Sequence, residues 1–158
     1  MQTTHLAQAV AKLAPDGSQI RKLLALRGAS CAYCTLQAGQ ISRAMRHRSV
    51  EEIWFVLKGR GQLWRKRGIA EHVVDLAPGL CTAIPRGVHF QFRNTGRGPL
   101  ELVLCTLPPW PGNLEAVRVA DYWQTSRPAA DRLSRQRPRA GRVSVGAWSR
   151  GVKRRGAR

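Results

Sequence analysis

The feature that most constrains the fold of this chain is a regular succession of turn signals in its central part. Glycine- and proline-containing turns recur about every eight to ten residues, a spacing typical of sandwiches and small barrels. They are Gly59-Arg60-Gly61, Arg67-Gly68, Pro78-Gly79, Pro85-Arg86-Gly87 and Asn94-Thr95-Gly96. The helix of a βαβ unit needs a longer uninterrupted stretch than these intervals leave. The spacing therefore predicts an all-β fold.

Candidate strands fill the intervals, and no helical pattern is present between residues 19 and 107. We expect strands at 19–27, 29–37, 41–47, 52–58, 62–66, 72–76, 80–84, 88–93 and 100–107. Residues 1–18 are interpreted as a peripheral segment with a short helix, and residues 19–125 as the barrel domain. Residues 126–158 are rich in Arg and Gly and poor in large apolar residues, which predicts a disordered tail.

The stretch from Met45 to Gly61 holds the most informative side chains. Within its strand, Glu52, Trp54 and Val56 point to one face, whereas Ile53, Phe55 and Leu57 point to the other. Both faces are largely apolar, so we expect the strand to be covered on both sides. A carboxylate on a covered face needs a partner, a proton or a metal. His47, five residues before Glu52, is the candidate partner.

This stretch resembles the first motif of the cupin superfamily, a group of small jelly-roll β-barrels. That motif places a glycine before His-x-His, then a glutamate and a second glycine. The matching positions in this chain are Gly39, His47, Glu52 and Gly59, and the second motif matches at Gly79, Pro85, Gly87 and Asn94. The resemblance covers about residues 20 to 110. It implies an all-β, cupin-type jelly-roll barrel that pairs into a homodimer.

The chain departs from the family at the metal ligands, which in metal-binding cupins are three histidines and the glutamate. Met45 and Phe90 stand at two of the histidine positions, so only His47 and Glu52 remain. Strand alternation sets His89 opposite to Phe90 and turns it away from the core, unless a bulge rotates it inward. The placement of His72 is open. Two ligands are too few for a closed metal site, so no cofactor is expected, with a divalent metal as the alternative.

The remaining features predict a small-molecule pocket. We expect Met45, Trp54, Phe90 and Phe92 in its walls, with His47 and Glu52 as its polar and catalytic pair. A histidine beside a carboxylate favours the imidazolium and the ionised carboxylate together. The pair would then orient a ligand or transfer a proton. The structural alternative is an ion pair that closes the barrel without a ligand.

Three functions follow from these observations. The first is a small-molecule-binding cupin that acts as a sensor or low-activity enzyme. The second is a metal-dependent isomerase, dioxygenase or decarboxylase with an unusual ligand set, which requires His89 or His72 to reach His47 and Glu52. The third is contact with nucleic acid or another polyanion through the tail. The net charge of the chain is +18, and residues 127–158 hold eleven Lys or Arg and one acid.

The rest of the chain gives weaker signals. Cys31 and Cys34 form a CxxC pattern, but in a strand residues three apart face opposite sides, which predicts ordinary thiols. Trp110, in a proline-rich arm, is expected to cover the barrel mouth, seal its own core or pack on a partner subunit. Residues 19–27 and 29–37 are candidates for a shared dimer edge. No run of about 18 apolar residues is present, so a cytoplasmic protein without membrane contact is the default expectation.

Overall fold

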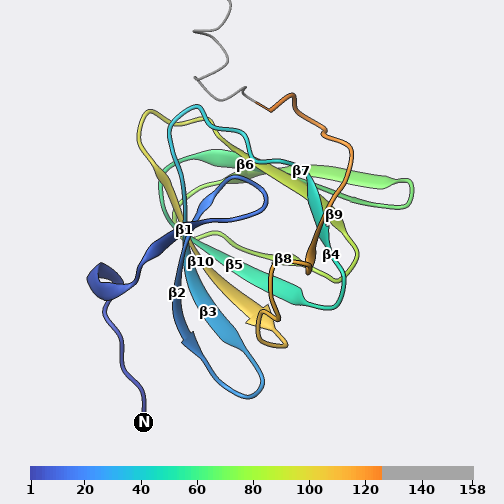
Figure 1. The fold of residues 1–158 in the computed structure, drawn as a ribbon. Coiled ribbons are helices and arrows are strands. Elements are labelled where there is room, and N and C mark those ends of the chain that lie inside the picture. The colour runs from blue at the N-terminus through green and yellow to red at the C-terminus, as the bar shows by residue number, and fades with distance from the viewer. Residues whose placement is uncertain (126–158) are drawn as a thin grey trace, which may run out of the picture. The chain divides into compact units, whose positions relative to one another are not determined.

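The computed structural model describes residues 1–125, which form two antiparallel β-sheets facing one another (Figure 1). The predicted disordered tail at 126–158 lies outside the described residues, and its polyanion-binding role stays a prediction. No helix within residues 1–125 is long and apolar enough to span a membrane. The predicted all-β jelly-roll barrel is confirmed.

One sheet has six strands in the order β1-β2-β3-β10-β5-β8. They are β1 (Ala11–Leu13), β2 (Gln19–Ala25), β3 (Ser30–Leu36), β10 (Leu100–Leu107), β5 (Glu51–Lys58) and β8 (Cys81–Ile84). The other sheet has five strands in the order β11-β4-β9-β6-β7. They are β11 (Ala116–Arg118), β4 (Met45–His47), β9 (His89–Asn94), β6 (Gly61–Arg67) and β7 (Ala70–Leu76). Apolar side chains from both sheets meet between them and form the core.

Three features of the chain's periphery differ from the expectations. The N-terminal segment contains only a 3₁₀ turn, η1 (Leu6–Gln8), followed by strand β1. Strand β11 was not expected, and Ile41 makes only an isolated bridge to Arg93. Strand β3 is not an edge, because it pairs with β2 on one side and β10 on the other. The free edge on this side of the sheet belongs to β1.

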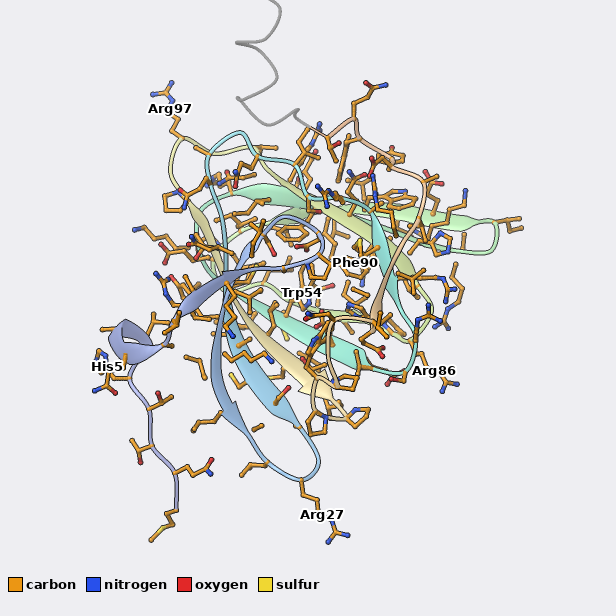
Figure 2. The ribbon with its side chains drawn as sticks, viewed as in Figure 1. His5, Arg27, Trp54, Arg86, Phe90 and Arg97 are labelled. Atoms are coloured by element: carbon orange, nitrogen blue, oxygen red, sulfur yellow. The ribbon has the colours of Figure 1, made fainter. Side chains whose placement is uncertain are left out.

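Strand β5 shows the predicted alternation but not the predicted double covering. Trp54 and Val56 are buried, whereas Ile53, Phe55 and Leu57 are 46%, 42% and 44% exposed. The inward side chains pack against the opposite sheet, whereas the outward ones are open to solvent over nearly half of their surface. Figure 2 shows Trp54 and Phe90 inside the barrel. The apolar outer residues therefore form a surface, not a second core.

Gly59 is required by the turn between β5 and β6. Its φ of 89° lies in the left-handed region that residues with a Cβ rarely adopt. A Cβ at this position would lie 2.4 Å from the carbonyl oxygen of Pro99. The backbone of residues 99–100 thus passes too close to admit a side chain, which explains a glycine at the end of the first motif.

Gln91 is fully buried, although alternation places it on the outward side of β9. The segment at residues 121–123 lies over it and forms its environment. The Gln91 side-chain amide donates to the carbonyls of Ser42 and Trp123, at 2.7 and 2.9 Å. Its oxygen accepts from the backbone N–H groups of Tyr122 and Trp123, both at 2.8 Å. One side chain therefore ties the end of the described chain onto the sheet.

Candidate ligand-binding site

A cavity of about 500 Å³ lies between the inward faces of the two sheets. Side chains from both sheets line it, and they include all six residues that the sequence predicts for the site. These are Met45 and His47 of β4, Glu52 and Trp54 of β5, and Phe90 and Phe92 of β9. They converge because each stands at the inward position of its strand.

Aromatic rings form one wall of the cavity. Trp54 packs edge-on against Phe90 and Phe92, with ring centroids 5.6 and 5.0 Å apart. The imidazole of His47 packs edge-on against Phe90 at 5.0 Å and against Trp110 at 5.3 Å. Trp110 thus lies at the cavity of its own barrel, and its backbone N–H donates to the hydroxyl of Ser30 at 3.0 Å.

Glu52 is a buried carboxyl that its neighbours hold in position. The indole N–H of Trp54 donates to Glu52 Oε2 at 2.7 Å. Thr106, buried on β10, stands directly opposite Glu52 in the strand pairing. Burial raises the pKa of Glu52 to about 7, although hydrogen bonds from Trp54 and Thr106 act in the opposite direction. Near neutral pH the carboxyl is therefore divided between the protonated and the ionised form.

His47 is buried, with only 3% of its surface exposed, and its Nδ1 atom has no hydrogen-bond partner. Burial lowers the pKa of His47 to about 4, against a smaller opposing effect of Glu115. At neutral pH the imidazole is therefore uncharged. A buried nitrogen without a partner is a position where a ligand group gains a hydrogen bond.

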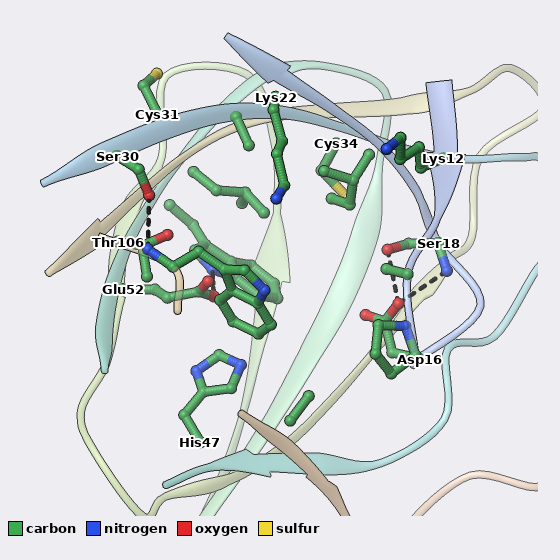
Figure 3. A pocket seen from close by; sticks show the side chains of 18 of the residues that line it. Lys12, Asp16, Ser18, Lys22, Ser30, Cys31, Cys34, His47, Glu52 and Thr106 are labelled. Carbon is green, nitrogen blue, oxygen red and sulfur yellow. Dashed lines mark hydrogen bonds between the residues drawn. The ribbon is translucent and has the colours of Figure 1, made fainter. Parts of the chain in front are cut away.

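The expected imidazolium–carboxylate pair between His47 and Glu52 is wrong. The ion pairs among residues 1–125 are Lys66–Glu71 and Arg118–Asp121, both elsewhere. The reason is desolvation. Burial destabilises the charged form of each group by more than an oppositely charged neighbour would stabilise it. The two side chains face the same space (Figure 3) as a neutral base and a weak acid.

The residues present do not fit a divalent metal. Met45 and Phe90, at two family histidine positions, are direct partners in the β4–β9 pairing, and both are buried. His89 of β9 pairs with Lys66 of β6 and does not line the cavity. His72 is exposed on β7. No three His, Cys, Asp or Glu within residues 1–125 come together in a metal-binding arrangement. His47 and Glu52 remain two potential ligands without a third.

Several cavity residues were not predicted from the sequence. Lys12, Asp16, Ser18 and Lys22 line the cavity from the N-terminal part of the chain. One signal was available, since Lys22 has the same strand parity as the apolar Ile20 and therefore shares its face. The two sulfurs of the CxxC pattern point in different directions, as predicted (Figure 3): Cys34 lies buried in the core, and Cys31 stands opposite Cys105.

Two antiparallel sheets that enclose one cavity define a jelly-roll barrel. Residues 32–106 match the family model described as Cupin domain, and this match confirms the resemblance to the cupin superfamily that the motifs predicted.

Three similar proteins illustrate the comparison. The uncharacterized protein MJ1618 of Methanocaldococcus jannaschii is 29% identical over 100 residues, which cover 60% of this chain and 77% of that protein. A Klebsiella pneumoniae protein with a double-stranded β-helix domain superposes with a TM-score of 0.59 at 17% identity, over 77% of this chain and 99% of that one. Streptomyces PAC13, in a variant solved with uridine, superposes with a TM-score of 0.61 at 12% identity, over 75% of this chain and 90% of that one.

Proposed function

We propose that this protein binds a small organic molecule in the barrel cavity, with His47 and Glu52 as its polar recognition groups, and acts as a sensor or a low-activity enzyme. The observation that carries the proposal is the unpartnered Nδ1 of a buried histidine beside a cavity of about 500 Å³. An apolar cavity with a few convergent polar groups is the usual form of a small-molecule site.

The protonation states of His47 and Glu52 are suited mainly to hydrogen bonding with a ligand and, in addition, to proton transfer. A neutral imidazole and a half-protonated carboxyl can each donate or accept a hydrogen bond, so a neutral polar ligand group is accommodated by both. A carboxyl with a pKa of about 7 is also suited to general acid–base catalysis near neutral pH. The structural neighbour Pac13 is a nucleoside dehydratase, which supports small-molecule chemistry in a barrel of this fold.

The metal-dependent alternative has less support. It requires His89 or His72 to join His47 and Glu52, and neither side chain lines the cavity. No step is therefore assigned to a metal ion in the proposed function.

The test is a fragment screen by ligand-observed NMR on the full-length protein. The comparison variant is Ala32→Trp, because Ala32 lines the cavity and is half-buried, so a large side chain there would occupy the space. Val73→Trp, on the exposed outside of β7, is the matched control. We expect fragments that bind the parent and Val73→Trp but not Ala32→Trp. Absence of binding to the parent, or binding that all three share, would contradict the proposal.

A further inference from the structure

The cavity has two chemically different ends. His47 and Glu52 are buried, together with the rings of Trp54 and Phe90. Lys12 of β1 and Lys22 of β2 also line the cavity, but both are exposed and so belong to its rim. A ligand that spans the cavity therefore meets aromatic rings and neutral polar groups at one end and ammonium groups at the other.

Strand pairing places Lys22 on the cavity side of the sheet. In the β2–β3 pairing, Lys22 stands opposite Ala32 and Ile20 stands opposite Cys34. Ile20, Ala32 and Cys34 all line the cavity, so this register sets Lys22 on the same face. Figure 3 shows the Lys22 side chain extending from its strand into the space above Glu52.

Within residues 1–125 the two ammonium groups have no ion-pair partner. Neither Lys12 nor Lys22 takes part in the ion pairs among residues 1–125. Two carboxyl groups, Asp16 and Glu52, line the cavity with the lysines. Asp16 Oδ1 accepts from the backbone N–H and the hydroxyl of Ser18, at 2.9 and 2.7 Å. Glu52 Oε2 accepts from the indole N–H of Trp54 at 2.7 Å. Burial also raises the pKa of Asp16. A bound anion would therefore be the first strong partner of these lysines.

We propose that the ligand is a small organic acid whose carboxylate lies at Lys22 and Lys12, whose flat body packs against Trp110 and Phe90, and whose neutral polar end hydrogen-bonds His47 or Glu52. This inference rests on the proposed function and specifies its ligand class. A carboxylate matches the charge of an ammonium group, and the hydrogen bond between them is stronger than one between neutral groups. The aromatic rings favour an unsaturated body over a branched aliphatic one.

The experiment uses matched pairs of probes, namely aromatic carboxylic acids and their primary amides, such as 4-hydroxyphenylacetate and 4-hydroxyphenylacetamide. Dissociation constants are measured by NMR titration on the full-length protein. We expect each acid that binds to be held roughly tenfold more tightly than its amide, the factor expected for one charge-assisted hydrogen bond. In Lys22→Met, which keeps the aliphatic stem, the preference for the acid over the amide should fall several-fold, because only Lys12 remains to bind the carboxylate.

The matched control is Lys58→Met, which removes the same charge from an exposed position that does not line the cavity. It should leave the preference for acids intact, because the preference comes from the cavity rim and not from the overall charge of the chain. Equal loss in both variants would show non-specific attraction and overturn the inference. Amides that bind as tightly as their acids would also overturn the inference. If Ala32→Trp abolishes that binding, the ligands occupy the cavity and the proposed function still holds. If no probe binds at millimolar concentration, the inference fails, and the fragment screen decides the proposed function.

Discussion

Glu52 and His47 share one cavity, and burial moves their pKa values in opposite directions. The pKa of Glu52 rises from 4.5 to about 7, and that of His47 falls from 6.5 to about 4. As the pH rises from 4.5 to 7, the folded state retains a proton on Glu52 that the unfolded chain releases, so this contribution to stability falls. Between pH 4 and 6.5 the unfolded chain holds a proton that folded His47 lacks, so the contribution of His47 to the free energy of unfolding rises with pH. The two effects offset one another.

Removing either residue should expose the effect of the other. Relative to the parent, the free energy of unfolding of Glu52→Gln should increase by about 3 kcal/mol between pH 4 and pH 8. That of His47→Gln should decrease by about 3 kcal/mol between pH 4 and pH 7. Urea unfolding at a series of pH values measures both. His72→Gln, at an exposed position, should follow the parent at every pH. Profiles of the two site variants that also run parallel to the parent would contradict the account.

At the scale of the element, alternation along single strands was enough to predict most of the candidate site. The inward positions of β4, β5 and β9 were assigned from sequence, and the six predicted side chains do line one cavity. Alternation could not show what covers the outside of a strand. Gln91 was placed outward and is buried, because the distant segment at residues 121–123 lies over it. Ile53 was placed under a second covering layer and is instead 46% exposed.

Gln91 should be the anchor of that C-terminal segment. In Gln91→Leu, the backbone N–H groups of Tyr122 and Trp123 lose their acceptor, and we expect a loss of about 3 kcal/mol in the free energy of unfolding. Gln62→Leu is the matched control on the same sheet. Gln62 bonds Asp75 and Arg93 but is half-exposed, so water can replace these bonds and the loss should stay below about 1 kcal/mol. Equal losses in the two variants would show that Gln91 has no special role.

At the scale of the whole molecule, the sequence predicted the barrel from its turn spacing and its two motifs. Strand parity sets Lys22 on the face of Ile20, but the charged rim forms only through the pairing of β1 with β2 and of β2 with β3, which brings Lys12 and Lys22 to one cavity. It also failed on the charge state of the central pair. Proximity along the chain suggested an ion pair, whereas the degree of burial, which depends on the complete fold, favours neutral groups.

We propose the outer face of β5, and not residues 19–27 and 29–37, as the contact surface of the expected homodimer. Ile53, Phe55 and Leu57 form an apolar row there, with the charged Glu51 and Lys58 at its ends. Two chains of net charge +18 repel one another, so pairing needs an apolar contact of this kind. Light scattering after gel filtration should show a dimeric parent and a monomeric Phe55→Glu. Val73→Glu, exposed on β7, should remain a dimer. A monomeric parent would end this proposal.

The central claim is that the cavity is a small-molecule site built on His47 and Glu52 without a resident metal. Elemental mass spectrometry of the full-length protein, purified without a histidine tag, tests this claim most directly, with His47→Ala measured beside it. We predict metal far below one equivalent per chain and no difference between the parent and the variant. Near-stoichiometric metal in the parent that is lost in His47→Ala would contradict the account and make His47 a metal ligand.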